Sequence, residues 1–136
     1  MTINDLYDLA SAEHITVTAF DLHSREALSF MEPDGSCHIA IDPFALASPA
    51  DELTKLAHEL GHCVTGSFYN IYSDCDNRRQ HERRADKWAI KKLVPEDELR
   101  YAIYGGLTEP WELAELFGVS EDMIRRAAEL YGSNGV

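Results

Sequence analysis

The sequence predicts an α+β fold, because strand-like segments lie near its start and helical patterns fill the remainder. A chain of 136 residues suits one domain, so we expect a single unit over residues 1–136. We divide this unit into a core over residues 1–93 and a helical C-terminal section over residues 94–131. Hydrophobic residues make up 45% and charged residues 26% of the chain, which is typical of a folded globular protein.

The first part of the chain predicts one helix and then three short strands. Apolar residues between Ile3 and Ala10 recur at helical spacing, so an amphipathic helix should cover about residues 2–13. A Pro33-Asp34-Gly35 turn precedes the last of the strands. We expect a meander, in which each strand pairs with the next along the chain. The segments rich in β-branched and aromatic residues lie at 15–20, 27–30 and 37–42.

Helical patterns begin at residue 48 and continue to the end of the chain. Ser48 is an expected N-cap with Pro49 behind it, so a helix should cover about residues 49–66. The last helix should begin after Ser120 and end at Gly132. After a loop over 67–77, the remaining helices are expected at 78–93, 96–104, 109–117 and 121–131.

Charge and hydropathy argue against two classes of partner. The formal net charge is -12, which opposes binding to a phosphate backbone, so we do not expect nucleic acid as the main partner. No apolar segment approaches the roughly 20 residues of a membrane span. The first residues lack the basic and then apolar pattern of a secretory signal. We therefore expect a soluble cytoplasmic protein that does not bind membranes.

Cysteine usage predicts free thiols. Cys37, Cys63 and Cys75 are odd in number, and no two of them form a Cys-x-x-Cys pair. A disulfide framework or a structural zinc knuckle is therefore not expected. We expect reduced, partly buried side chains in a reducing compartment.

A His-Glu-x-x-His motif, His58-Glu59-Leu60-Gly61-His62, lies inside the predicted 49–66 helix. Histidines four residues apart share one helix face, so both imidazoles can reach one zinc ion. Glu59 is then the candidate general base that takes a proton from the attacking water and passes it to the leaving amine. The alternative is a solvent-exposed face that happens to carry two histidines opposite an apolar stripe. That stripe consists of Leu53, Leu56, Ala57, Leu60 and Val64.

The 78–93 helix supplies a candidate third ligand, which would decide between these alternatives. Glu82 falls near the middle of the helix's apolar side, where a carboxylate is costly unless a metal compensates it. The alternative for Glu82 is a salt bridge to a nearby arginine. Asp86 is placed one turn later, where it can accept the second ring N–H of His58 or His62. The apolar side consists of Ala85, Ala89, Ile90 and Leu93.

The expected zinc site therefore has His58, His62 and Glu82 as ligands and an open fourth position, as in catalytic rather than structural sites. Cys75 is the one residue that could close that position. No residue can be assigned to stabilise an oxyanion. The candidates for that role are His81, Tyr69 and Tyr72.

These motifs resemble those of the ImmA/IrrE metallopeptidases, relatives of the thermolysin-type zincins with a His-Glu-x-x-His…Glu-x-x-x-Asp pattern. HELGH at 58–62 and ERRADKWA at 82–89 carry the resemblance, and most of residues 1–131 is similar. One departure is Trp88, where the family more often has Phe. The resemblance implies a small zincin-like domain with zinc on His58, His62 and Glu82, catalytic Glu59 and supporting Asp86. It also implies a zinc-dependent endopeptidase that cleaves or inactivates a helix-turn-helix repressor of a phage or mobile element.

The tail from Leu113 to Ile124 is similar to a helix-turn-helix, with Gly118 in its turn. Residues 93–136, however, carry 3 basic and 9 acidic residues, a net charge of -6 that opposes a DNA-facing helix. We therefore expect a helical hairpin that packs beside the core or docks a partner. Residues 78–92 are the exception in this acidic chain, with a net charge of +5 from 7 basic and 2 acidic residues.

Two functional hypotheses remain open. The first is a zinc-dependent endopeptidase acting on a repressor-like protein. The second is a non-proteolytic regulatory protein that keeps the zinc site and binds a repressor or another transcription regulator. Under either hypothesis, the acidic surface predicts attraction of a basic protein partner, with association that weakens as salt rises.

Overall fold

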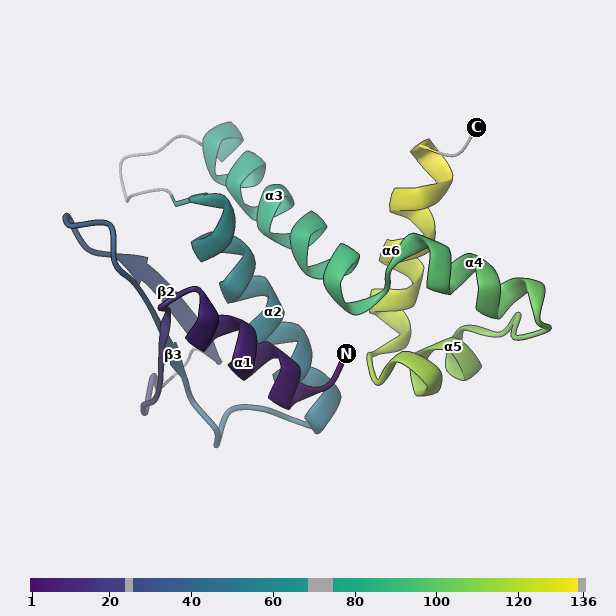
Figure 1. Ribbon diagram of the computed structural model, residues 1–136, viewed down its shortest axis with the longest axis horizontal. Coiled ribbons are helices and arrows are strands. Elements are labelled where there is room, and N and C mark those ends of the chain that lie inside the picture. The colour runs from purple at the N-terminus through teal and green to yellow at the C-terminus, as the bar shows by residue number, and fades with distance from the viewer. Residues whose placement is uncertain (24–25, 69–74, 135–136) are drawn as a thin grey trace.

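A computed structural model of the chain describes residues 1–23, 26–68 and 75–134, and it confirms the α+β class. The α1 helix (Ile3–Ala12) precedes a three-stranded sheet, and five further helices follow the sheet (Figure 1). The strands are β1 (Thr16–Ala19), β2 (Ala27–Met31) and β3 (Cys37–Ile41). The later helices are α2 (Pro49–Thr65), α3 (Cys75–Leu93), α4 (Glu96–Tyr104), α5 (Pro110–Phe117) and α6 (Glu121–Asn134).

The sheet is mixed, and its strand order is β1-β3-β2, so the expected meander is wrong. The β3 strand lies in the middle, parallel to β1 and antiparallel to β2. It is also the strand with the clearest alternation, because Cys37, Ile39 and Ile41 are all buried. Sequence periodicity locates strands but does not order them, and here the strand with the most buried face occupies the centre. As a consequence, β2 lies at an edge of the sheet.

The α2 helix is the central element of the core. It contacts α1, the sheet strands β2 and β3, and α3 on its remaining side (Figure 1). Four of the five residues of its predicted apolar stripe are buried, whereas Val64 is 42% exposed near the helix end. Fully buried side chains from separate elements, among them Leu6, Ile39, Leu60 and Leu93, pack into one core around this helix.

Local capping explains where α2 begins and ends. The Ser48 side chain accepts a hydrogen bond from the Asp51 backbone N–H (3.1 Å), as its N-cap position predicts. Gly66 ends the helix with a left-handed conformation (φ 66°) that glycine adopts without steric cost. The other ends are less well predicted. The α3 helix begins at Cys75, earlier than expected, and α6 continues through Gly132 to Asn134.

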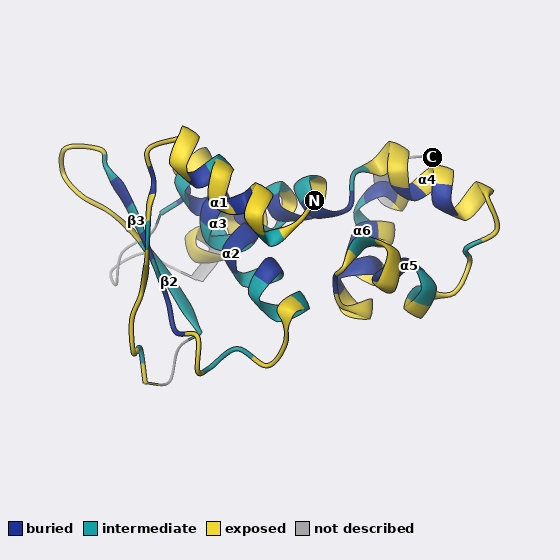
Figure 2. Cartoon of the chain, turned by 60° about the horizontal axis from the view of Figure 1, so that its bottom comes forward, coloured by how far each residue is buried: buried dark blue, intermediate teal, exposed yellow. Residues whose placement is uncertain are grey.

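The C-terminal section forms its own cluster of helices beside α3. The α5 and α6 helices pack against each other, and α6 also packs against α3. The Tyr131 hydroxyl of α6 donates a hydrogen bond to the Val94 carbonyl (2.6 Å), so the end of α6 is fixed to the connection between α3 and α4. Figure 2 shows that most of α4 and of the connection after it is exposed, whereas α5 alternates between exposed and buried residues. Within the described ranges, no helix is both long and apolar enough to cross a membrane.

Candidate metal site and cleft

The site is built where α2 and α3 approach most closely. A Cβ atom added to Gly61 would lie only 2.6 Å from the carbonyl oxygen of Ala85, so only glycine allows this spacing. Ala85 itself is fully buried against α2. His58 and His62 lie on either side of Gly61 along α2, and both face α3. The face is therefore covered rather than solvent-exposed, and His62 keeps only 5% of its surface accessible.

Three side chains converge between the two helices. The Nε2 atoms of His58 and His62 are 3.2 Å apart. Glu82 brings one carboxylate oxygen to 2.8 Å from the His58 Nε2 and the other to 3.2 Å from the His62 Nε2. The Glu82 side chain is 40% exposed, so it lies at the rim of the helix interface and not, as expected, inside an apolar surface. The three residues form a group of ligand atoms compact enough to hold one metal ion.

The geometry and chemistry of this group fit zinc. Two ligands at the usual zinc distance of about 2.05 Å in a tetrahedron are about 3.3 Å apart. The two Nε2 atoms are 3.2 Å apart, as are His62 Nε2 and Glu82, whereas Glu82 lies closer to His58 Nε2, at 2.8 Å. Both histidines also use their Nδ1 atoms in hydrogen bonds to oxygen acceptors, which leaves Nε2 available as the ligand atom. Two imidazoles and one carboxylate are a ligand set typical of catalytic zinc.

Asp86 and Arg126 support the His58 ring. The Nδ1 atom of His58 donates to a carboxylate oxygen of Asp86 at 2.8 Å, so Asp86 lies against His58 rather than His62. The other carboxylate oxygen of Asp86 lies 3.4 Å from a guanidinium nitrogen of Arg126. Arg126 belongs to α6, so the C-terminal section contributes to the surroundings of the site. This series of contacts restrains the orientation of the imidazole.

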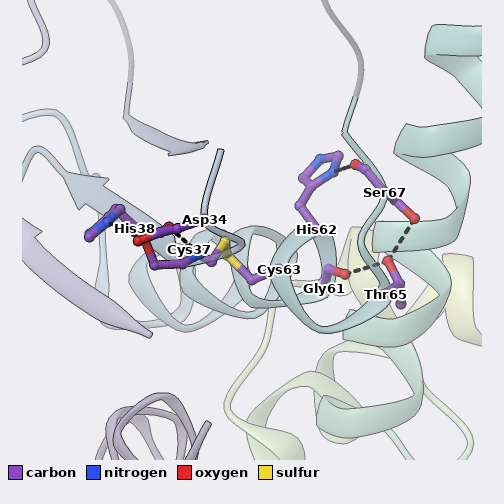
Figure 3. The surroundings of a disulfide bond; sticks show 9 residues. Asp34, Cys37, His38, Gly61, His62, Cys63, Thr65 and Ser67 are labelled. Atoms are coloured by element: carbon purple, nitrogen blue, oxygen red, sulfur yellow. Dashed lines mark hydrogen bonds between the residues drawn. A yellow bond between two sulfur atoms is a disulfide. The ribbon is translucent and has the colours of Figure 1, made fainter. Parts of the chain in front are cut away.

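Ser67 supports the His62 ring through its backbone. The chain turns back at Gly66, and this turn places the Ser67 carbonyl where it accepts a hydrogen bond from His62 Nδ1 (Figure 3). Ser67 is fully buried, and its hydroxyl oxygen lies 2.7 Å from the Thr65 hydroxyl. Arg84 of α3 donates to the same Ser67 oxygen at 3.4 Å. The residues after α2 are thus fixed to α3 as well as to the histidine.

A disulfide joins Cys37 of β3 to Cys63 of α2, next to His62 (Figure 3). The expectation of free thiols is therefore wrong for these two residues. They are 26 positions apart in sequence, but packing of β3 on α2 brings their Cα atoms to 5.9 Å. Only the fold, and no local spacing rule, brings them together. The side chain of Cys75 lies outside the described part of the structure, so its expected role in closing the site has no structural counterpart.

Electrostatics in the metal-free site favour a protonated His58 and an ionised Glu82. Burial alone lowers the pKa of His58, but hydrogen bonds with Asp86 and Glu82 outweigh it and raise the pKa to about 9. The pKa of His62 is also raised, because its hydrogen bonds to Glu82 and Ser67 outweigh its burial. Hydrogen bonds from His58 and His62 hold the pKa of Glu82 well below its usual range. A metal cation would replace the proton that the histidines share with Glu82.

A cleft of about 390 Å³ opens beside these residues. Glu59 lines it together with His58, Glu82, Asp86 and Arg126, so the acidic residue of the motif faces the same space as the ligand group. Glu26 and Ala27, the first residue of the edge strand β2, also line the cleft. Glu26 forms an ion pair with Lys55 of α2 (3.7 Å), which also lines the cleft.

The structure brings together His58, Glu59, His62, Glu82 and Asp86, which are the five residues that the sequence singled out. His81 lies on α3 but is absent from the cleft lining, and Tyr69 and Tyr72 lie outside the described residues. Sequence reasoning missed Arg126 and Ser67. Arg126 is distant in sequence and Ser67 acts through its backbone, so neither residue left a signal in the sequence patterns.

Comparison with known proteins agrees with this geometry. A family model described as the IrrE N-terminal-like domain, a peptidase family, matches residues 12–129. No match to the chain was found among the curated proteins. The family match covers well over half of the chain, from the end of α1 to α6, and includes every residue of the site. The chain belongs to the IrrE N-terminal-like peptidase family.

Proposed function

We propose that the protein is a zinc-dependent endopeptidase whose ligands are His58, His62 and Glu82. The observation that carries this proposal is the convergence of two Nε2 atoms and a carboxylate within 3.2 Å, in a cleft that Glu59 also lines. Membership of a peptidase family gives independent support. The open side of the ligand group faces the cleft, as a catalytic site requires.

The residues of the cleft have distinct roles in this proposal. Bound zinc supplies a Lewis acid that activates water and polarises a peptide carbonyl. Glu59 accepts the proton of the attacking water and delivers it to the nitrogen of the leaving amine. Asp86 holds the His58 ring through Nδ1, and the Ser67 carbonyl holds the His62 ring, so that both Nε2 atoms point to one place.

The edge strand β2 offers a way to bind a polypeptide substrate. β2 pairs with β3 on one side only, and its first residue, Ala27, lines the cleft. A substrate segment in extended conformation can add to this edge through backbone hydrogen bonds and pass the ligand group. Such binding selects unfolded or flexible protein segments, because a folded helix cannot pair with a strand edge.

The proposed substrate class is a helix-turn-helix transcriptional repressor of a phage or mobile element. This part of the proposal rests on the family resemblance and on the net charge of -12, which attracts the basic DNA-binding surface of such a protein. The same surface would also serve the alternative function, a regulator that binds the repressor without cutting it.

Metal analysis tests the ligand assignment. The purified protein should contain about one zinc per chain, and His58→Ala should lose it. His38→Ala is a matched control, because His38 lies on β3 and contacts Phe30 and Glu32 instead of the site. Undiminished zinc in His58→Ala would refute the site.

Incubation with a purified helix-turn-helix repressor tests the reaction. Wild type should cleave the repressor, and Glu59→Gln should retain zinc but lose cleavage by about a thousandfold. Glu52→Gln, two turns earlier on α2, is the control that should remain active. If wild type and Glu59→Gln inactivate the repressor equally well without cleavage, the binding function replaces the enzymatic one.

A further inference from the structure

The outer side of α4 and α5 carries large apolar side chains in contact with water. Tyr101 is 84% exposed, and Trp111 and Leu116 are each 58% exposed. They surround two adjoining grooves that share Leu107 and Leu116, the larger with a volume of about 730 Å³. We call this the α4–α5 surface; its main residues are Asp97, Glu98, Tyr101, Leu107, Trp111, Glu112, Glu115 and Leu116, and Met1 also lines the larger groove. Gathered apolar side chains of this kind mark interaction sites in soluble proteins.

Carboxylates flank these apolar side chains. Asp97 and Glu98 lie on the α4 side, and Glu112 and Glu115 lie on the α5 side. Among the described residues, no cation lies within ion-pair distance of any of the four. Arg100, the only basic residue of α4, is already paired with Glu96 at 2.8 Å. The surface therefore combines an apolar centre with two carboxylates at each side that form no ion pair among the described residues, and the N-terminal residue Met1 is the one positively charged neighbour in the larger groove.

We propose that the α4–α5 surface is a docking site for a cationic amphipathic helix of a partner protein. The apolar side of such a helix would fill the grooves, and its lysine or arginine side chains would lie opposite the four carboxylates. Apart from Met1, the walls of both grooves come from α4, α5 and the connection between them, so no strand edge is available for an extended peptide. Anionic lipid surfaces and nucleic acids carry the same charge sign as the surface and are repelled.

The α4–α5 surface is separate from the metal site. None of its residues lines the cleft that holds Glu59, and α4 and α5 lie at the end of the molecule opposite the sheet (Figure 1). A partner bound here leaves the cleft open. The proposal consequently stands whether the protein is a peptidase or a binding protein.

A second copy of this chain is the main competing occupant, because residues 78–92 carry a net charge of +5. These cations lie on α3, however, and the apolar side of α3 is already buried in its own core at Ala85, Ala89, Ile90 and Leu93. The α3 helix can offer charge but no free apolar face to fill the grooves. A separate protein with a free amphipathic helix meets both requirements.

Calorimetric titration of the full chain with a synthetic peptide tests the proposal. The probe is a capped helical peptide of Leu and Lys with its leucines on one face, compared with a scrambled peptide of the same composition. The amphipathic peptide should bind at least about tenfold more tightly than the scrambled one, because only it presents a continuous apolar face. Its affinity should fall as salt rises.

Matched variants test whether the amphipathic peptide binds at the α4–α5 surface. Leu116→Ser should weaken binding by about tenfold, whereas Phe44→Ser, at a position 95% exposed outside the surface, should not. Glu112→Gln with Glu115→Gln should weaken binding by about tenfold at low salt. Glu13→Gln with Glu129→Gln removes the same charge from exposed positions elsewhere and should leave the affinity unchanged.

Three outcomes would overturn the proposal. One is equal affinity for the amphipathic and the scrambled peptide. Another is an equal loss of affinity in the Glu112/Glu115 and the Glu13/Glu129 double variants. Either result would mean that the peptide is attracted by net charge alone. The third is a dimer, detected by sedimentation at low salt, that Leu116→Ser abolishes, because the occupant would then be a second copy. All these substitutions are at solvent-accessible positions, so circular dichroism should show unchanged helix content.

Discussion

The α2–α3 pair and the C-terminal section α4–α6 are stabilised in opposite ways. The two helices are held to each other by a close backbone contact at Gly61 and by the polar contacts of Glu82 and Asp86, and the disulfide joins α2 to β3. The C-terminal section meets the core through α6 and leaves Tyr101, Trp111 and Leu116 exposed. A site that positions ligand atoms needs redundant restraints, whereas a surface that receives a partner must leave apolar area uncovered.

Removal of the disulfide should have the largest effect on the restrained region. The bond closes a loop with a sequence separation of 26 residues, so Cys37→Ser with Cys63→Ser should lower the free energy of unfolding by about 3.5 kcal/mol. Urea unfolding monitored by circular dichroism measures the change. A reductant should destabilise wild type equally and leave the double variant unaffected. If the reductant destabilises both proteins alike, the disulfide is not the cause.

Raising the pH should destabilise the zinc-free protein. The folded state raises the pKa of His58 from 6.5 to about 9, so this contribution is complete below pH 6.5 and is lost as the pH rises through 9. The free energy of unfolding in chelator should therefore decrease by up to about 3 kcal/mol across that range. Zinc affinity should rise over the same range, because fewer protons compete for the ligands.

Urea titrations in chelator, near pH 6 and near pH 9.5, measure this dependence. His58→Gln should flatten it, although His62 leaves part of the slope. His23→Gln is the control, because His23 is 89% exposed and contacts only Asp21 among the described residues. A slope that is unchanged in His58→Gln would rule out His58 as its source.

Gly61→Ala should disturb the helix pair through overpacking. The added methyl group would meet the Ala85 carbonyl at 2.6 Å, so the helices must separate, at a cost of about 2 kcal/mol in unfolding free energy. Zinc affinity should fall as well, because Glu82 moves away from both histidines. Gly132→Ala is the matched control in α6, where nothing lies within 4 Å. That control should be neutral or stabilising by about 0.5 kcal/mol.

The Arg126→Ala variant tests whether the C-terminal section is energetically coupled to the metal site on α2 and α3. Arg126 lies 3.4 Å from Asp86 and acts on His58 only through that carboxylate, so zinc affinity should fall by no more than about tenfold. Competition with a chromogenic chelator provides the measurement. Arg125→Ala is the control: Arg125 is 63% exposed and paired with Glu121, so its removal should leave the zinc affinity unchanged. Arg126→Lys keeps the positive charge and should restore part of the zinc affinity that Arg126→Ala loses. Equal zinc affinity in wild type and Arg126→Ala would show that the C-terminal section does not influence the site.

Sequence patterns located the elements better than their arrangement. Ser48 and Gly66 act locally, so the ends of α2 were predicted within one residue, and the bounds of α4 match at 96–104. The strand order was not predictable, because alternation in β3 says that one face is buried but not which strands flank it. The position of Glu82 on the predicted 78–93 helix made it the expected third ligand, and it does meet both histidines, but from the rim of the helix interface rather than from an apolar face. Contacts between distant residues, such as Cys37 with Cys63 and Arg126 with Asp86, leave no local pattern in the sequence.

The position of β2 at the edge of the sheet has a consequence for the protein's solubility. A strand edge that is open to a substrate is equally open to the strand edge of another copy, and Phe30 and Met31 on β2 are 46% and 43% exposed. The strand is only five residues long, and it lies between Glu26 on one side and Glu32 with Pro33 on the other. Brevity, flanking charge and a proline are the means by which natural edge strands resist aggregation. The chain can thus keep one edge available without becoming a template for fibrils.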